Sequence, residues 1–446
     1  MKIRKIHGIK LITGIMALSM LLGGCSAFDG LKNTGNSKQV KISHVELKDD
    51  PDIKAEINFD DVKSTEYNSE DLDAAYRRYS FNLFSRAVKD YGGEGNVMIS
   101  PASIMMALDM VAAGAKGESL QQLTDLLAQG QGPLKQQAYA AALMKTLNET
   151  EDVKFSCANA VWNNARNLGD KVNMDYVSYI RETFLAEYTV TEFDEKTPGE
   201  INAWVSEHTD RMIEKVIDEL DPDAAMLLVN AISFEGEWTV AYNDDSVTEG
   251  NFTSSDGSTQ SATFLNDSST AYYETDKATG FIKRYKGGRY SFLAILPADD
   301  RISANEFAEN FTYEDYEKFI NSVTYQYTVI SKMPEFKSDF ELLLNDTVTG
   351  LGAGDIFVPD KADFSGIAGK PGDICISRII HKTHIEVDRE GTRASAVTAI
   401  EPTVAGIEEY VEPEYRYVNC DRPFVYAIVD GKTMTPVFIG TVNSVN

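Results

Sequence analysis

The feature that most constrains this chain lies near its C-terminus, in the stretch Glu386-Val-Asp-Arg-Glu-Gly-Thr-Arg-Ala-Ser-Ala-Val-Thr-Ala-Ile400. It begins with the alternation of a β-strand, breaks at Gly391 and continues with small side chains, including Ala394, Ser395 and Ala396. Side chains of this size bury too little apolar surface to hold a core of their own. The stretch is therefore either a solvated loop or a strand that completes a sheet formed by the rest of the chain.

The composition describes a globular and strongly acidic protein. Of its 446 residues, 43% are hydrophobic and 25% are charged, as is typical of a domain with a large core. The formal net charge of -27 would be repelled by nucleic acids and by anionic membrane surfaces, so we expect neither to be bound electrostatically. A basic protein partner would be attracted.

The N-terminus has the pattern of a secretion signal. Basic residues precede an apolar run from Leu11 to Leu22, which is too short to span a bilayer, since that needs roughly 20 residues. The ending Leu22-Gly23-Gly24-Cys25 resembles a bacterial lipoprotein signal, which implies that residues 1–24 are removed and Cys25 is acylated. We expect the protein on the extracellular face of a bacterial cell, anchored in the membrane through Cys25 or released from it. The alternative is an ordinary signal peptide with an incidental cysteine.

The remaining chain predicts a tether and one domain. Residues 25–69 are rich in polar and acidic residues and predict a flexible tether. No Pro- or Gly-rich linker divides residues 70–446, so we expect a single mixed α+β domain with large sheets. Apolar spacing predicts a first helix around Leu72 to Val88 and a later helix from Ile201 to Leu220.

No motif of catalysis or metal binding is present. The sequence has neither a Gly-x-Ser-x-Gly elbow nor a Walker loop. His381 and His384 stand three apart on an expected strand, so their rings would point to opposite faces. We therefore expect no enzyme, no metal and no cofactor. Three cysteines remain beyond Cys25, with spacings that favour free thiols: Cys157, Cys375 and Cys420.

Several stretches, in order along residues 70–446, together resemble the serpin family of serine protease inhibitors. They are Asn96-Val-Met-Ile-Ser-Pro-Ala-Ser103, Gly114-Ala-Lys-Gly-Glu118, Leu228-Val-Asn-Ala-Ile-Ser-Phe-Glu-Gly-Glu-Trp238, Met333-Pro-Glu-Phe336, Leu351-Gly352, Ala362-Asp-Phe-Ser-Gly366, His381-Lys382, Glu390-Gly-Thr392 and Arg422-Pro-Phe424. Any one of these motifs is weak, but their shared order is specific.

The resemblance implies the serpin fold: a large central β-sheet, smaller sheets, about nine helices and an exposed reactive-centre loop near the C-terminus. It also implies a monomeric suicide inhibitor. A target protease cleaves the loop, the N-terminal part of the loop inserts into the sheet as a strand, and the acylated protease is carried along and trapped. The alternative is a surface binding protein on the same fold that has lost inhibition.

The resemblance also implies which residues take part in loop insertion. The hinge of the loop is Gly391, Thr392, Ala394, Ser395 and Ala396. A polar cluster beneath the sheet, where the sheet must part, is Ser100, Ser103, Asn230 and His381, and Trp238 marks the end where insertion starts. Arg389 and Arg393 stand where the family usually has glutamates, and Arg211 where it tends to have glycine.

Counting fifteen residues from Gly391 puts the reactive bond at Ala405-Gly406. Fifteen residues of strand reach roughly 50 Å, enough to run from pole to pole of such a domain. Thr403, Val404 and Ala405 are small or aliphatic, which predicts an elastase-like serine protease, and acidic residues beyond the bond would attract a basic one. The loop is longer than is usual in the family. Gly406-Ile407 and Tyr410-Val411 therefore remain alternatives, as do chymotrypsin-like and cysteine proteases.

Overall fold

A computed structural model describes residue 45, residues 47–392 and residues 414–445. All of these described residues belong to one compact unit. The described residues contain eleven α-helices, of which α1, α6 and α11 have six residues or fewer, and four β-sheets. This is the mixed α+β fold with one large central sheet that the sequence predicts.

The central sheet has six strands. In spatial order they are β13 (Phe336–Leu343), β14 (Ile376–Val387), β15 (Gly391–Thr392), β6 (Met226–Glu237), β3 (Val153–Asn164) and β5 (Glu187–Thr191). Strands β14 and β6 also pair directly with each other over most of their length. The short strand β15 lies between them at one end only.

Three further sheets complete the β-structure. The second six-stranded sheet has the order β2 (Met98–Ile99), β18 (Pro436–Val442), β17 (Phe424–Asp430), β11 (Tyr290–Pro297), β10 (Ala278–Arg284) and β9 (Tyr272–Glu274). The four-stranded sheet has the order β16 (Tyr415–Asn419), β12 (Thr328–Pro334), β8 (Thr259–Ser269) and β7 (Val247–Thr253). Strands β1 (Lys48–Asp49) and β4 (Lys171–Val172) form a small parallel pair.

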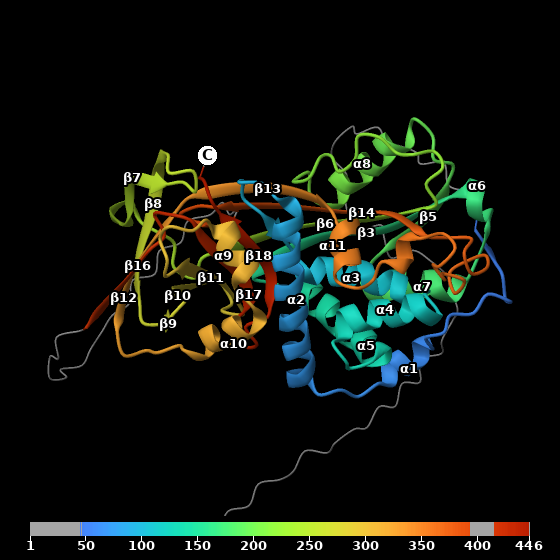
Figure 1. The fold of residues 1–446 in the computed structure, drawn as a ribbon, viewed down its shortest axis with the longest axis horizontal. Helices are drawn as coiled ribbons and strands as arrows, with labels where there is room; N and C mark the ends of the chain where they lie inside the picture. The colour runs from blue at the N-terminus through green and yellow to red at the C-terminus, as the bar shows by residue number, and fades with distance from the viewer. Residues whose placement is uncertain (1–44, 46, 393–413, 446) are drawn as a thin grey trace, which may run out of the picture. The chain divides into compact units, whose positions relative to one another are not determined.

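The helices cover both faces of the central sheet, with α8 on one face and α3, α4, α5 and α7 on the other (Figure 1). They are α1 (Phe59–Ser64), α2 (Ser69–Tyr91), α3 (Pro101–Ala112), α4 (Gly117–Ala128), α5 (Pro133–Asn148), α6 (Ala165–Leu168), α7 (Met174–Phe184), α8 (Thr197–His208), α9 (Ala304–Asn310), α10 (Tyr313–Asn321) and α11 (Asn345–Gly350). Among these helices none is both long and apolar enough to cross a bilayer.

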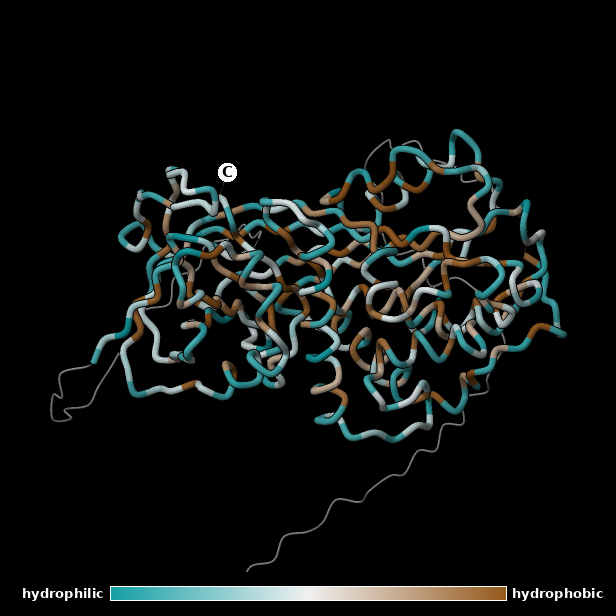
Figure 2. Tube along the Cα trace, in the orientation of Figure 1, coloured by the Kyte–Doolittle hydropathy of each residue, from teal (hydrophilic) through white to brown (hydrophobic). Residues whose placement is uncertain are grey.

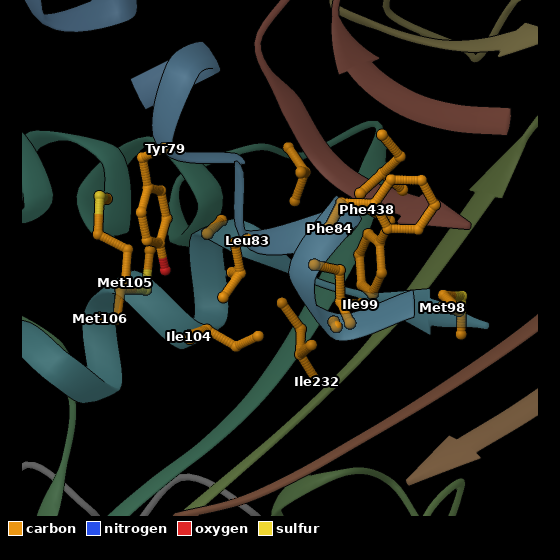
Figure 3. Close-up of a cluster of buried hydrophobic side chains, with 14 of the residues drawn as sticks. Tyr79, Leu83, Phe84, Met98, Ile99, Ile104, Met105, Met106, Ile232 and Phe438 are labelled. Carbon is orange, nitrogen blue, oxygen red and sulfur yellow. The ribbon is translucent and has the colours of Figure 1, made fainter. Parts of the chain in front are cut away.

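The main core lies between the sheets and the helices α2 and α3. Figure 3 shows Tyr79, Leu83 and Phe84 of α2 gathered with side chains of β2, α3, β6 and β18, all of them buried. Hydrophobic segments run through the strands and the helices packed on them, while hydrophilic segments mark the outer turns (Figure 2). At the start of helix α3, the Ser100 side chain accepts the backbone N–H of Ser103, and Pro101 lies in the first turn.

Helix α8 ends at His208, so the helix predicted from Ile201 to Leu220 is too long. Asp210 and Arg211 both have left-handed backbones, with φ of 50° and 64°. The chain then folds back, and the Asn202 side chain accepts backbone N–H groups of Val216 and Ile217. Apolar residues after the turn keep a helical spacing but pack as a non-helical segment onto the sheet. Periodicity alone could not show this.

The packed domain begins before Glu70, earlier than predicted. Val45 donates its backbone N–H to Val190 at 3.1 Å, and β1 pairs with β4. Phe59 of α1 stacks on Tyr179 with ring centroids 4.2 Å apart. Because these contacts are spread over a short polar segment without a long apolar period, the composition resembles that of a tether.

Candidate functional site

The candidate site is the boundary between β6 and β14, which we call the slot. The two strands run parallel and pair from Ile376 opposite Met226 to His384 opposite Ser233. Beyond that rung their direct pairing stops and β15 lies between them. The sheet is closed along most of the slot and already parted at the C-terminal ends of the two strands.

Gly391 and Thr392, two of the predicted hinge residues, form β15. They pair with Glu237 and Gly236 in the antiparallel sense. A Cβ atom at position 391 would lie 2.2 Å from the carbonyl oxygen of Gly236 and 2.7 Å from Cα of Glu237. Glycine is therefore required by the close approach of two backbones.

Thr392 is already held as an interior side chain of the sheet. It is fully buried, and its Oγ1 lies 2.7 Å from the hydroxyl of Tyr285. The Tyr285 ring stacks on Trp238 with centroids 4.5 Å apart. Burial raises the pKa of Tyr285, so the phenol stays neutral beside the threonine.

Trp238 holds the turn that precedes β15. Its indole Nε1 donates to the carbonyl of Asp388 at 3.0 Å, and its backbone N–H donates to the carbonyl of Glu390 at 3.0 Å. The Asp388 carboxylate accepts the backbone N–H groups of Glu390 and Gly391. These bonds fix the point where the chain turns from β14 back into the slot. Next to it, Arg389 points outward and pairs with Asp244 at 2.9 Å.

The polar residues predicted beneath the sheet come together in one network. The backbone N–H of Ser100 donates to His381 Nε2 at 3.1 Å, so the ring proton is on Nδ1. Nδ1 donates in turn to Asn230 Oδ1 at 2.8 Å. The Asn230 amide donates to the hydroxyl and the carbonyl of Ser103. The network therefore ties both strands of the slot to the first turn of α3.

His381 is neutral in this network. Complete burial lowers the pKa of the imidazole to about 3, because a charged ring would lose its hydration. A proton on Nε2 would also face the N–H of Ser100, which now uses that nitrogen as its acceptor.

Asn159 belongs to the same network and was not predicted. It lies on β3 directly opposite Asn230, and its Oδ1 accepts from the Asn230 amide at 2.8 Å. The signal for it in the sequence is a polar residue inside the otherwise apolar run from Cys157 to Trp162, which needs a buried partner.

The other predicted site residues lie outside the described residues. They are Ala394, Ser395, Ala396, Thr403, Val404, Ala405, Gly406 and Cys25.

His384 points away from His381, as its spacing predicts, and its Nδ1 lies 2.6 Å from Asp339 Oδ1. Within residues 47–392 and 414–445, no cluster of three or more His, Cys, Asp or Glu side chains could hold a metal ion. Cys157, Cys375 and Cys420 are free thiols.

The fold and the slot match one protein family. Residues 74–445 match the family described as Serpin (serine protease inhibitor). The chain is 30% identical over 361 residues to Iripin-5 of Ixodes ricinus, covering 78% of this chain and 89% of that protein. It is 26% identical over 442 residues to an uncharacterized serpin-like protein of Methanosarcina mazei, covering 97% of each. The native state of tengpin, a thermophilic serpin, is 34% identical with a TM-score of 0.75, covering 90% of this chain and 97% of tengpin. The chain belongs to the serpin family.

Proposed function

We propose that this protein is a suicide inhibitor of serine proteases. The catalytic serine attacks the carbonyl of the residue before the reactive bond, the amine of the next residue leaves with a proton, and an acyl-enzyme remains. The freed end of the loop then enters the slot and carries the acylated protease with it. The observation that carries this proposal is β15, because two residues of the hinge already occupy the first rungs of the slot.

The direction of pairing favours further insertion. Strands β6 and β14 are parallel to each other, and β15 is antiparallel to both. A longer β15 would replace one parallel ladder by two antiparallel ladders, which are somewhat more stable per residue. The new strand would form backbone hydrogen bonds with both of its neighbours.

The register of β15 determines how many loop residues could insert as a strand alongside β6. Gly391 pairs with Glu237 and Thr392 with Gly236. In this antiparallel register, each further loop residue would pair with the next residue toward the N-terminus of β6. Pro402 would then face Met226, the first residue of β6. A proline has no N–H to donate, and the end of a strand tolerates it. The bond Ala405-Gly406 follows a few residues later, which supports it over Tyr410-Val411.

The same register provides partners for the unusual hinge arginine. Extended by one rung, Arg393 would face Glu235 of β6 and Glu386 of β14. Both glutamates lie on strands beside the parted end of the slot, and Glu386 is partly exposed. The positive charge of Arg393, at a position where the family usually has glutamate, would thus lie next to two carboxylates.

The loop sequence favours an elastase-like serine protease as the target. Val404 and Ala405 suit the shallow apolar pocket of an elastase-like protease, and the acidic residues beyond the bond suit a basic one. We further propose that Cys25 is acylated and holds the inhibitor at the outer surface of a bacterial cell, where secreted proteases would be met. Metabolic labelling with a fatty acid should label the wild type and not Cys25→Ser.

The test is to mix the full chain with elastase, chymotrypsin, trypsin and a cysteine protease. We expect an SDS-resistant adduct with elastase, and a released C-terminal peptide that begins at Gly406 in mass spectrometry. Cleavage by every protease without any adduct would instead identify a non-inhibitory member of the fold. A peptide that begins at Val411 would move the bond and the target class toward chymotrypsin-like enzymes.

A further inference from the structure

Two exposed tyrosines stand directly after the loop, on the strand where the described chain resumes. Tyr415 and Tyr417 of β16 expose 46% and 64% of their surface. They pair in register with Thr328 and Ile330 of β12, so these four side chains share one face of the four-stranded sheet. The opposite face buries Val329 and Val418 against the core.

The base beneath the tyrosines is rigid. Strand β16 is held by its ladder to β12, and the backbone N–H of Thr328 donates to the carbonyl of Glu414 at 2.9 Å. Arg416, on the other face, lies over the Tyr327 ring at 3.9 Å and pairs with Glu414 at 2.7 Å. The backbone that carries the tyrosines is therefore held in place, so a partner that covers them has only their side chains to order, and a tyrosine has few rotatable bonds.

The chain length fixes what can cover this face. Tyr415 is nine residues beyond Gly406, so its backbone lies within about 30 Å of the reactive bond even if the loop is fully extended. A protease of about 230 residues has a radius of gyration near 17 Å. An enzyme that holds the bond in its active site is therefore large enough to reach the edge of the sheet where β16 lies (Figure 1).

We propose that Tyr415 and Tyr417, with Ile330 of β12 beside Tyr417, form an exosite for the target protease, which is a contact outside the active-site cleft of the protease. Tyrosines are enriched among the residues that dominate binding at interfaces. The sequence between the bond and β16 is acidic, with Glu408, Glu409 and Glu412. The matching rim of the protease should thus be basic, with Lys or Arg side chains that stack on the tyrosine rings. This inference rests on the proposed function for its partner, since the occupant is the protease that cleaves the loop.

The test measures the second-order rate constant for loop cleavage by the protease that cleaves the wild type. In Tyr415→Ala/Tyr417→Ala we expect it to fall about tenfold, as for the loss of an interface hot spot. The conservative Tyr415→Phe/Tyr417→Phe should stay within about twofold, because it keeps the rings. Leu343→Ala is the matched control, since Leu343 is an exposed apolar side chain at the end of β13, and it should leave the rate unchanged.

The melting temperature and the adduct yield per cleavage show whether a slower cleavage of the double alanine variant comes from a lost contact with the protease or from damage to the fold. An exosite predicts that both stay at the wild-type value while the rate falls. A double alanine variant cleaved at the wild-type rate would overturn the inference, whether or not adducts form. If that variant instead changes the sedimentation of the free protein with no change in rate, the face joins two copies of this chain and the inference is wrong. If the wild type is cleaved without forming an adduct, the proposed inhibition is wrong. The exosite would still be testable, because its test measures the rate of cleavage.

Discussion

At the scale of single residues, the turn after α8 carries backbone strain. Arg211 has a φ of 64°, a conformation that costs a non-glycine residue roughly 1 kcal/mol. We expect Arg211→Gly to raise the free energy of unfolding by about 0.5 kcal/mol, because part of the relief is lost to the greater freedom of glycine in the unfolded chain. Urea unfolding monitored by circular dichroism would measure it.

Asp210 provides the control for that prediction. It has a left-handed φ of 50° in the same turn, but its carboxylate accepts from Ser156 Oγ at 2.8 Å and pairs with Lys154 at 2.6 Å. Asp210→Gly should therefore destabilise the protein. If both glycine variants change stability in the same direction, backbone strain does not explain the turn.

His381 should make the folded state sensitive to acid. Its pKa is about 3 when folded and near 6.5 when unfolded, so the unfolded chain binds more protons between these values. This contribution is complete above about pH 6.5 and is lost as the pH falls, at about 1.4 kcal/mol per pH unit.

Asp109 opposes that trend. Its carboxylate is buried on α3, accepts from the side-chain amides of Gln136 and Gln137, and burial raises its pKa to about 7. The folded state therefore binds the extra proton between about pH 4 and 7, and this contribution is lost as the pH rises. The two effects should nearly cancel between pH 4 and 6.5.

Single variants separate these two effects. In urea unfolding between pH 5 and 6.5, Asp109→Asn should lose stability with falling pH relative to the wild type, while His381→Gln should gain it. Exposed carboxylates contribute equally to all three proteins, so the difference in slope is the measurement. Parallel curves for the three proteins would contradict the assignment.

Some residues of the slot could be predicted from the sequence, and others could not. Ser100, Ser103, Asn230 and His381 were found through motifs and are brought together by the fold. Asn159 was missed because its role depends on the register of β3 with β6, which no short motif encodes. The reason for a glycine at position 391 is likewise a contact between distant backbones.

At the scale of elements, β15 tests whether hinge insertion controls inhibition. Thr392 occupies a fully buried site beside the hydroxyl of Tyr285, where a charged side chain would lose its hydration. Thr392→Arg should therefore convert the inhibitor into a substrate, with adduct yield reduced at least about tenfold and the cleavage site unchanged. Arg389→Ala, at an exposed residue before the hinge, should keep the wild-type yield. An undiminished adduct yield in Thr392→Arg would refute the role of this residue.

The next rung gives an electrostatic prediction. Arg393→Glu would bring a third carboxylate between Glu235 and Glu386 as the strand enters. We expect the rate of insertion to fall about two- to fivefold, which corresponds to a partly exposed ion pair. Adding Glu235→Lys should restore much of the rate in stopped-flow fluorescence of a loop label. A rate unaffected by Arg393→Glu would show that the register changes beyond Thr392.

Elements with strong local patterns were predicted well, and elements set by tertiary contacts were not. The helix predicted around Leu72 to Val88 matches α2. The segment after His208 keeps helical spacing, yet the bonds from Asn202 fold it back. The segment that contains β1 and α1 packs through scattered contacts, so its polar composition predicted a tether.

At the scale of the whole molecule, the central claim is that the cleaved loop becomes a strand of the central sheet. Residues 393–402 would add about ten residues to β15, each with roughly 1 kcal/mol of net hydrogen bonding. For a chain of this size, each kcal/mol raises the melting temperature by about 1 °C. Insertion should therefore stabilise the protein by far more than the cut destabilises it.

The most direct test is the melting temperature of the protein before and after a single cleavage in the loop, followed by calorimetry. We predict a rise of about 10 °C for the cleaved wild type, and little change for cleaved Thr392→Arg, in which the arginine prevents insertion of the hinge. An unchanged or lower melting temperature for the cleaved wild type would contradict insertion into the slot.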